Sequence, residues 1–376
     1  MNLPHTQTTS EYVACAYTQK LVKIVPALRS LGHRVVVIGS EENEIECDEY
    51  IIGWTKEDQR RWFGVNDHYT NFFNITWGVD DIHWVESNRR AIELIQARIT
   101  PRDKLMLIAG CCQKAIATAF PNHISVEYGI GYKGVFSDYK VFESYAWMHY
   151  VYGTMQQETG IYYDAVIPNY FDEQDFDFQN QPDEYFVFVG RLINWKGPHI
   201  AADIAKRSGR KLIMAGQGVQ HQEPGRIVAT DGTVIEGNHV EHIGHVNAAQ
   251  RNELMRNAAA IITPTVYIEP FGGVSVEAMM CGTPVIASDF GVFTETIPHG
   301  FAGYRFRTIG EGVWAANNIE SLSRKDIHTY AVENFSTEAV KYKYDEYLAQ
   351  LDTLWDEGFY TEWAGVSPVD RYTIWR

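Results

Sequence analysis

Short apolar runs rich in β-branched residues alternate with helix-like segments along most of the chain, and this alternation constrains the fold more than any other feature. Residues 34–39 are predicted to form a buried strand after an amphipathic helix. Further strands are predicted at 105–109 and 124–127, with a short helix at 115–119 between them. Strands buried on both faces and joined by helices are typical of parallel sheets. The sequence therefore predicts a doubly wound α/β fold.

The alternation breaks once, between about residues 163 and 184, and then resumes. The second part of this segment is acidic, rich in Gln and contains Pro, so we interpret it as a linker. A chain of 376 residues is long enough for two domains with separate cores. We predict domains at 1–168 and 169–352, and an aromatic-rich tail at 353–376 that packs across the N-terminal domain. The second half carries predicted strands at 185–189, 211–215, 261–262 and 284–287 and predicted helices at 198–207 and 336–355.

Composition excludes several classes of protein. The 32 Lys and Arg residues against 48 Asp and Glu give a formal net charge of −16, which argues against a general nucleic-acid-binding protein because phosphate contacts need clustered cations. The odd number of cysteines, 5, does not form a disulfide framework, and Cys111 and Cys112 are expected as buried reduced thiols. No apolar stretch approaches the roughly 18 residues that span a bilayer, and no signal-peptide pattern is present. We therefore expect a cytoplasmic protein without stable membrane insertion.

Two cations follow the predicted strand at 185–189, in the turn before a helix. Gly190 ends the strand, and Arg191 and Lys196 stand in the turn. Free N–H groups at the start of a helix favour anions, so this arrangement suits a ligand that carries phosphate. Taken alone, such a pair is more often two solvated surface cations.

A second constellation joins paired glycines to two carboxylates. Gly272 and Gly273 let a ligand approach the backbone closely, and amides in the first turn of the following helix can bind hydroxyl or phosphate oxygens. Glu269 can accept hydrogen bonds from sugar hydroxyls, and Glu277 lies one turn into the helix. A plain turn would explain the two glycines alone, and a solvated helix face would explain Glu277 alone. Neither explains why glycines and carboxylates occur together in one turn and helix.

Weaker signals follow two other predicted strands. Residues 216–218 (Gly-Gln-Gly) can form a ligand-binding loop, although a tight turn explains them at least as well. Residues 242–246 precede a helix, and their backbone can frame a planar base. Histidines in a loop at a strand end are the alternative explanation.

Neither a metal site nor a membrane-binding surface has a strong signal. The sequence has no CxxC pair and no HExxH helix, so we expect no metal ion. Asp175 and Asp177 have the spacing of a metal-binding Asp-x-Asp pair, but they lie in the acidic linker and are interpreted as solvated. Lys20, Lys23 and Arg29 lie off the apolar stripe of the first helix. A solvated face explains them, and peripheral contact with a membrane is the alternative.

In order and content, these motifs resemble the retaining nucleotide-sugar glycosyltransferases of family 4. The resemblance is dense from about residue 164 to 300, and its motifs lie at 166–172, 189–197, 216–218, 243–246, 269–279 and 282–287. Those enzymes have the α/β GT-B fold, in which two Rossmann-like domains face each other across a cleft. The resemblance implies the same fold here, with an acceptor-side domain at 1–168 and a donor-binding domain at 169–352.

The resemblance also implies roles for matching residues. Arg191 and Lys196 would hold the donor diphosphate. Glu269 would bind hydroxyls of the transferred sugar and Glu277 those of the ribose; Arg191, Lys196 and Glu269 form the predicted catalytic set. The remaining donor-binding positions would be Gly190, Gly216, Gly244, His245, Val246, Phe271, Gly272, Gly273, Val274 and Ser275.

The N-terminal half departs from the family pattern. Residues 1–4 leave almost no first strand, and residues 5–10 stand where relatives carry a glycine-rich loop. The hydroxyls of Thr8 and Thr9 are candidates for contact with a phosphate or acceptor, with a plain polar loop as the alternative. Where many relatives place a histidine, this chain has Glu127, either an active-site carboxylate or a capping or core-edge residue.

We therefore expect a metal-independent retaining hexosyl- or pentosyltransferase of glycan biosynthesis. It would move a sugar from a nucleoside-diphosphate sugar, a co-substrate, to a hydroxyl of a carbohydrate acceptor, without a cofactor. Two cations and a helix N-terminus would stabilise the charge of the leaving diphosphate. The alternatives are a sugar-nucleotide epimerase or phosphorylase of the same fold, or a non-catalytic sugar-nucleotide-binding protein.

Overall fold

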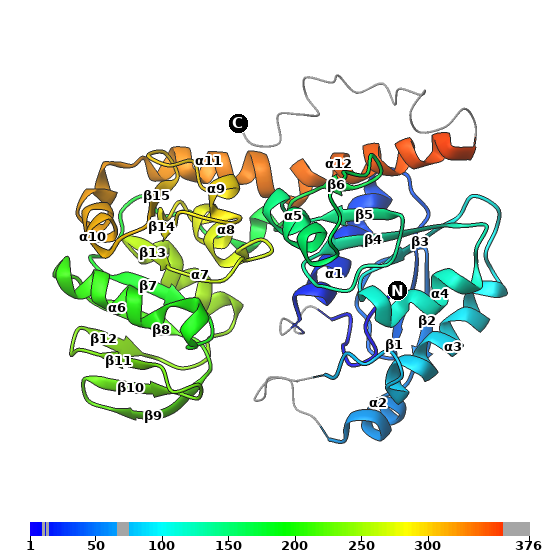
Figure 1. Cartoon of the computed structure of the whole chain (residues 1–376), viewed down its shortest axis with the longest axis horizontal. Coiled ribbons are helices and arrows are strands. Elements are labelled where there is room, and N and C mark those ends of the chain that lie inside the picture. The colour runs from blue at the N-terminus through cyan, green and yellow to red at the C-terminus, as the bar shows by residue number, and fades with distance from the viewer. Residues whose placement is uncertain (10–11, 13–14, 66–74, 356–376) are drawn as a thin grey trace. The chain divides into compact units, whose positions relative to one another are not determined.

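The computed structural model describes residues 1–9, 12, 15–65 and 75–355. They divide into two compact units, which are described separately (Figure 1). The N-terminal unit holds Met1–Glu143, Val151–Tyr170 and the described residues from Val340 onward. The C-terminal unit holds Ser144–Tyr150 and Phe171–Ala339.

The N-terminal unit contains two parallel sheets. One pairs β1 with β2, and the other has the order β3-β4-β5-β6. The strands are β1 (Val36–Ser40), β2 (Glu49–Trp54), β3 (Lys104–Leu107), β4 (Ile124–Ile130), β5 (Tyr139–Phe142) and β6 (Ala165–Val166). The helices are α1 (Ala16–Ser30), α2 (Lys56–Phe63), α3 (Ile82–Gln96), α4 (Lys114–Ala119), part of α5 (Tyr145–Thr154) and most of α12 (Thr337–Asp352).

Helix α12 confirms a predicted pattern but changes a predicted boundary. Its buried residues recur at helical spacing, as the sequence indicated. Tyr344 lies 6.5 Å from Tyr128 and 5.9 Å from Tyr170 between ring centroids, so this face packs on the N-terminal core. Residues 340–352 therefore group with the N-terminal unit, whereas the prediction placed them in the domain at 169–352. Most of the predicted tail at 353–376 lies outside the described residues.

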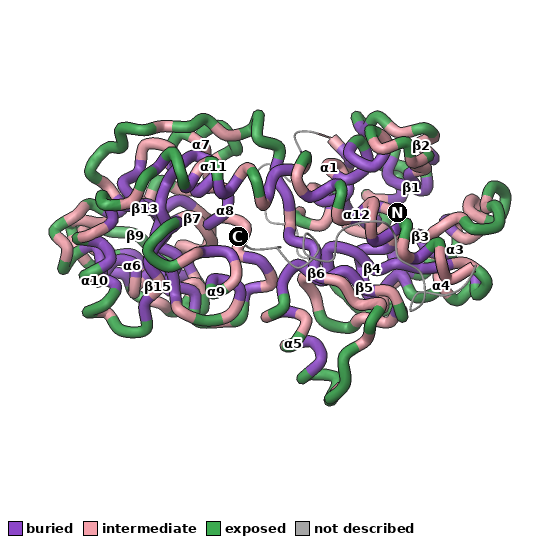
Figure 2. Tube along the Cα trace, turned by 90° about the horizontal axis from the view of Figure 1, so that it is seen from above, coloured by how far each residue is buried: buried purple, intermediate pink, exposed green. Residues whose placement is uncertain are grey.

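The C-terminal unit is built on a six-stranded parallel sheet with the order β12-β8-β7-β13-β14-β15. Residues on its strands alternate between two buried clusters: Val187 and Ile261 face α8 and α11, whereas Phe186 and Ile262 face α6 and α10. The central strands of the sheet are thus buried on both faces, and Figure 2 shows the buried residues of β7 and β13. Its strands are β7 (Phe186–Val189), β8 (Leu212–Ala215), β12 (Val240–His242), β13 (Ala260–Thr263), β14 (Val285–Ser288) and β15 (Gly303–Phe306). Its helices are α6 (Pro198–Arg207), α7 (Ala248–Asn257), α8 (Gly273–Met280), α9 (Phe293–Thr296), α10 (Ile309–Asn318) and α11 (Arg324–Phe335).

A small antiparallel sheet between β8 and β12 was not predicted. Its strands β9 (Val219–Glu223), β10 (Arg226–Ala229) and β11 (Val234–Glu236) are short, and β9 is exposed and polar along most of its length. At its tip, the N–H of Thr230 donates to the Gly218 carbonyl at 2.8 Å, and an Asp231 carboxylate oxygen accepts from the N–H of Asn194 at 2.7 Å. The tip therefore contacts the loops that follow β7 and β8.

The segment interpreted as a linker packs on the C-terminal unit from Phe171 onward. Arg324 is buried and donates to the carbonyl of Gln179 at 2.6 Å, and the N–H of Gln179 donates to the carbonyl of Cys281 at 3.3 Å. Asp177 is exposed but pairs with Arg256 at 3.1 Å. The interpretation as a free linker is therefore wrong for residues 171–184, because polar composition does not reveal these backbone contacts.

Helix α1 requires a further correction. Lys20, expected on a solvated or membrane-facing side, is 2% exposed. Its ammonium group lies 2.8 Å from the Glu143 carboxylate and donates to the Gly129 carbonyl at 2.9 Å. A buried cation is tolerated when it is paired in this way. All five cysteines are free, with Cys112 buried and Cys111 half-buried.

Candidate functional site

The loops that follow β7, β8, β12 and β13 meet at one edge of the C-terminal sheet, because parallel strands end on the same side. Backbone hydrogen bonds join these loops in pairs. Gly216 donates to the Gly244 carbonyl at 2.8 Å, and Val266 donates to the Trp195 carbonyl at 2.8 Å. Four segments far apart in the sequence thus form one continuous surface.

Two glycines make this close approach feasible. A Cβ on Gly216 would lie 1.9 Å from the carbonyl oxygen of Gly190, and a Cβ on Gly197 would lie 2.3 Å from that of Pro264. Their φ values are +150° and +71°, which side chains rarely adopt. Gly216 and Gly197 are therefore required by contacts between loops.

Lys196 and Glu269 form an ion pair at this edge. The Tyr267 hydroxyl donates to the second carboxylate oxygen of Glu269 at 2.5 Å, and the Lys196 ammonium donates to the Tyr267 oxygen at 3.2 Å. Thr265 adds a hydrogen bond of 3.4 Å to Glu269. Glu269 is buried, so its charge is compensated by these donors. The structure thus brings together two of the three predicted catalytic residues and adds Tyr267 and Thr265 beside them.

The paired glycines begin helix α8. Gly272 has φ +70° and is the N-cap residue, and Gly273 is the first residue of the helix. The Ser275 hydroxyl is buried and donates to the Thr263 hydroxyl at 3.3 Å. Phe271 packs in the core, 5.8 Å from Phe335 between ring centroids. The side chains of Phe271 and Ser275 therefore serve packing, which leaves backbone groups for a ligand. Val274 is half-buried.

Glu277 makes a two-pronged contact with Arg251. Arg251 Nε lies 2.8 Å from one carboxylate oxygen, and a terminal nitrogen donates to the other at 3.3 Å. Planar pairing of this kind fixes a carboxylate in direction as well as in place. Sequence reasoning did not single out Arg251, since nothing in its local pattern distinguishes it from Arg256, the other cation of α7.

The remaining predicted donor-binding residues lie on the same loops. Arg191 and His245 are exposed, whereas Gly190, Gly244 and Val246 are half-buried. Gly244 has φ +81° and accepts the hydrogen bond from Gly216. The predicted pairing of Arg191 and Lys196 on one diphosphate stays a prediction.

In the N-terminal unit, the candidate threonines differ in their surroundings. Thr8 is fully buried, and its hydroxyl donates to the Asn43 side chain at 2.7 Å and lies 3.2 Å from the Tyr50 hydroxyl. Thr9 is half-buried, and its carbonyl accepts from the N–H of Tyr12 at 3.2 Å. These contacts favour a structural role for Thr8, and a ligand contact for either threonine stays a prediction.

Glu127 lies inside strand β4 and is fully buried. Its carboxylate accepts from the backbone N–H groups of Phe136 and Ser137, both at 2.7 Å, and from the Tyr132 hydroxyl at 3.1 Å. Burial raises the pKa of Glu127, and these three donors oppose that shift. The contacts favour the capping or core-edge alternative, with Glu127 holding the loop at 132–137.

In the part of the chain that the structure describes, no three His, Cys, Asp or Glu side chains are grouped as ligands for a metal ion. None of the described helices combines the length and the apolar character needed to cross a bilayer.

The sequence is similar to known glycosyltransferases. Residues 171–328 match the family described as "Glycosyl transferases group 1". An uncharacterized glycosyltransferase of Methanocaldococcus jannaschii is 31% identical over 167 residues, which are 41% of this chain and 42% of that protein. The phosphatidyl-myo-inositol mannosyltransferase of Mycobacterium leprae is 31% identical over 135 residues, 36% of this chain and 34% of that protein. The chain thus spans less than half the length of either relative.

Solved structures resemble nearly the whole chain. AviGT4, a glycosyltransferase involved in avilamycin A biosynthesis, has a TM-score of 0.62 at 18% identity over 93% of this chain and 96% of its own. Anabaena HepE, in complex with UDP-glucose, has a TM-score of 0.59 at 17% identity over 89% of this chain and 96% of its own. Identities this low show the fold alone. The predicted α/β class with two Rossmann-like domains is confirmed. The chain therefore has the GT-B fold, and its residues 171–328 are similar to glycosyltransferase group 1.

Proposed function

We propose that this protein is a metal-independent retaining glycosyltransferase that uses a nucleoside-diphosphate sugar and a carbohydrate acceptor. The observation that carries the proposal is the cluster of Lys196, Glu269 and the start of helix α8 at one edge of the C-terminal sheet. The family match covers this region, and HepE, a protein of similar fold, binds UDP-glucose. We further propose that the protein is cytoplasmic and that any membrane contact is peripheral.

The cations of the site would act on the leaving group. The bond between the sugar anomeric carbon and the diphosphate oxygen breaks, and a bond from the acceptor oxygen to the same carbon forms on the same face. The proton of the acceptor hydroxyl passes to an oxygen of the departing diphosphate. Lys196, Arg191 and the N-terminus of α8 would stabilise the charge that develops there, which is worth a few kcal/mol for each well-placed donor.

The carboxylates would hold the donor rather than attack it. Lys196 and Tyr267 hold the Glu269 carboxylate in place, and it would accept from hydroxyls of the transferred sugar. Glu277 is fixed by Arg251 and would accept from ribose hydroxyls. No covalent glycosyl-enzyme intermediate is needed in this scheme.

A donor panel tests the proposal. We expect one of the UDP-, GDP- or ADP-sugars to raise the Tm and to be hydrolysed slowly without acceptor. Ligand at about a hundred times its Kd adds about 2.7 kcal/mol to the free energy of unfolding. NMR of a transfer product should show the anomeric configuration of the donor, and EDTA should leave the rate unchanged. Conversion of the donor into another nucleotide sugar would identify an epimerase. Binding of the donor without hydrolysis or transfer would identify a non-catalytic protein.

A further inference from the structure

Trp77 is a large apolar side chain that the N-terminal unit leaves exposed. It lies in the segment between α2 and α3, and 46% of its surface is accessible. A single exposed aromatic side chain needs no explanation by itself, because most protein surfaces carry a few. The way in which the surrounding structure fixes Trp77 is what indicates a function.

One carboxylate holds the backbone on both sides of Trp77. Asp81 Oδ2 accepts from the Thr76 hydroxyl at 2.6 Å and from the Gly78 N–H at 2.9 Å. The Thr76 carbonyl also accepts from the indole nitrogen of Trp84 at 3.1 Å. An exposed side chain on a backbone that is held in this way is preorganised, so it loses little further freedom when a ligand binds.

Three other rings fix the orientation of the Trp77 indole. Trp84 is fully buried, and its ring lies 5.4 Å from that of Trp77 between centroids, with 34° between the ring planes. Tyr17 and His5 make edge contacts, with centroids 6.1 Å and 6.4 Å from that of Trp77. These rings come from separate segments of the chain, and they leave about half of the indole open as a flat apolar surface of fixed orientation.

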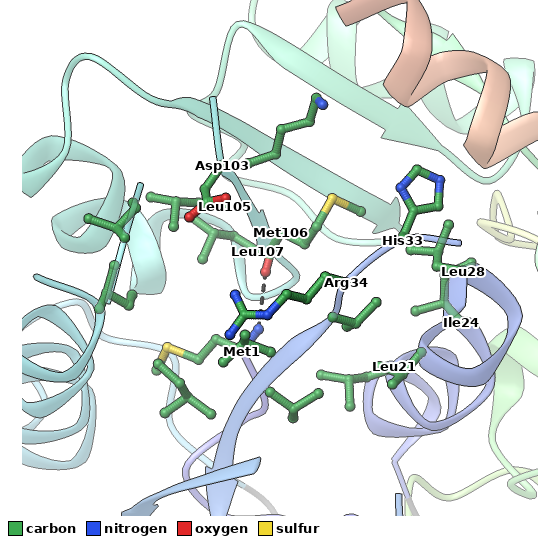
Figure 3. Close-up of a pocket in the computed structure, with 18 of the residues that line it drawn as sticks. Met1, Leu21, Ile24, Leu28, His33, Arg34, Asp103, Leu105, Met106 and Leu107 are labelled. Carbon is green, nitrogen blue, oxygen red and sulfur yellow. Dashed lines mark hydrogen bonds between the residues drawn. The ribbon is translucent and has the colours of Figure 1, made fainter. Parts of the chain in front are cut away.

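This surface lies where the parallel strands of the unit end. Strand β3 runs beside an apolar cavity of about 400 Å³ inside the unit (Figure 3). Beyond the last residue of β3, the Cys112 thiol donates to the Trp77 carbonyl at 3.5 Å. Beyond β4, the ring of Tyr132 lies 5.7 Å from that of Tyr17 between centroids. Ligands of open α/β sheets bind outside the carboxyl ends of the strands, so Trp77 lies at the edge where a substrate is expected.

The polar neighbours of Trp77 in the sequence are acidic. Asp80 is exposed and Asp81 is half-buried. Hydrogen bonds from Thr76 and Gly78 lower the pKa of Asp81, so it carries its negative charge at neutral pH. Carboxylates accept hydrogen bonds from hydroxyls but repel phosphate and anionic lipid headgroups. This charge favours a neutral ligand that has both hydroxyls and an apolar face.

We propose that Trp77 is a stacking platform for one neutral pyranose ring, with Asp80 as acceptor for the hydroxyls of that ring. The C–H groups on one face of a pyranose carry partial positive charge and would lie on the electron-rich face of the indole. In the complete reaction the ring would belong to the carbohydrate acceptor, and this last assignment rests on the proposed function. Binding of the sugar to Trp77 does not depend on it.

Saturation-transfer difference NMR tests the platform without a donor. The probes are methyl β-glucoside and methyl α-mannoside. We expect Trp77→Ala to raise the Kd of the bound glycoside about 3- to 10-fold, and Trp77→Phe to raise it less because a smaller aromatic face remains. Trp314→Ala, which removes another exposed indole, is the matched control and should leave the Kd unchanged. Equal Kd values for wild type and Trp77→Ala, or no signal from either glycoside with wild type, would overturn the platform.

A charged analogue tests the part assigned to Asp80. Methyl β-glucuronide differs from methyl β-glucoside by a carboxylate, so it should bind wild type more weakly. Asp80→Asn should reduce this difference and also weaken binding of the neutral glycoside. If both glycosides bind equally well to wild type, Asp80 is not beside the sugar and the proposal is overturned.

Kinetics separates the platform from the proposed function. With a donor identified from the panel above, Trp77→Ala should raise the KM of the acceptor and leave the Kd and slow hydrolysis of the donor unchanged. An unchanged acceptor KM would overturn the platform and leave the transferase in place. Conversely, glycoside binding through Trp77 without turnover of any donor would overturn the transferase and leave the platform.

Two further measurements cover misfolding and a different partner. Should Trp77→Ala fail to fold, Trp77→Phe decides: glycoside should shift the indole emission of wild type to the blue and leave that of Trp77→Phe unchanged. Val79 and Ile82 are also exposed, so cosedimentation with vesicles of equal parts phosphatidylcholine and phosphatidylglycerol is measured as well. Vesicle binding that Trp77→Ala abolishes would identify a membrane-binding surface and overturn the sugar platform.

Discussion

The Lys196 ammonium group and the Glu269 carboxylate form an ion pair although 72 residues separate them in the sequence. Each comes from a loop at the end of a parallel strand, β7 for Lys196 and β13 for Glu269, and these two strands are neighbours. Because the two strands are adjacent and parallel, the two motifs that follow them lie side by side and their charged residues form one group.

Replacement of Lys196 by Ala should lower kcat by about 100- to 1,000-fold, the usual cost of one preorganised donor to a developing charge. The fold should persist, because Tyr267 and Thr265 still donate to the buried Glu269 carboxylate. Steady-state kinetics and Tm measured together check this. Lys211→Ala, which removes the exposed pair with Glu241, is the matched control and should change neither. A Tm loss that fully accounts for the lost activity would contradict the assignment.

Replacement of Glu277 by Ala should raise the Kd of the donor about 10- to 100-fold, in proportion to the loss of hydrogen bonds to a charged group. Isothermal calorimetry with the nucleoside diphosphate alone should show the same loss, since the ribose is retained. Arg251→Met leaves the carboxylate in place but removes the group that fixes it. We expect this variant to show an intermediate loss. Donor affinity unchanged in Glu277→Ala would contradict contact with the ribose.

Replacement of Gly216 by Ala should destabilise the protein by about 2 kcal/mol or more, because the new Cβ would meet the Gly190 carbonyl and the backbone conformation is unsuited to a side chain. Urea unfolding measures the change. Gly153→Ala in helix α5 is a matched control, with no heavy atom within 4 Å of its Cβ. That variant should be stabilised by about 0.5–1 kcal/mol. A stable Gly216→Ala protein would show that the two loops can move apart.

The protein should lose stability as the pH falls below about 6.5, partly through His5. Burial lowers the pKa of His5 to about 3, so the unfolded chain binds a proton in this range that the folded chain does not. By linkage, this histidine alone costs at most about 2 kcal/mol at pH 5. Urea unfolding at pH 7.5 and 5 should show a smaller loss for His5→Gln. The exposed His221→Gln is the control and should behave as wild type.

Local signals in the sequence predicted the central elements well. Helix α6 was predicted at 198–207 and is found at Pro198–Arg207, because a left-handed Gly197 and Pro198 at the first turn mark its start physically. The β7 and β13 loops were likewise identified from glycines and charges that stand directly after apolar strands. Such signals are local, so they can be recognised in the sequence without knowledge of the rest of the fold.

Contacts between residues that are distant in the sequence explain why some features of the structure were not predicted. Nothing near Lys20 shows that Glu143 neutralises it, and nothing near Glu277 shows that Arg251 holds it. The polar strand β9 has no apolar pattern because it is exposed over most of its length. These features depend on tertiary contacts, which cannot be read from the hydrophobic pattern or from the secondary-structure propensity of the residues.

The hairpin tip at Thr230 and Asp231 offers a route for adjusting the candidate site without touching its charged residues. It is anchored to Gly218 and Asn194, on the two loops that also carry Gly216 and Lys196. Substitutions at the exposed positions of β9 would leave the core in place, whereas Ile227 of β10 and Ile235 of β11 are buried in it. Selection acting on the exposed positions of this hairpin can therefore alter the two loops without removing core side chains.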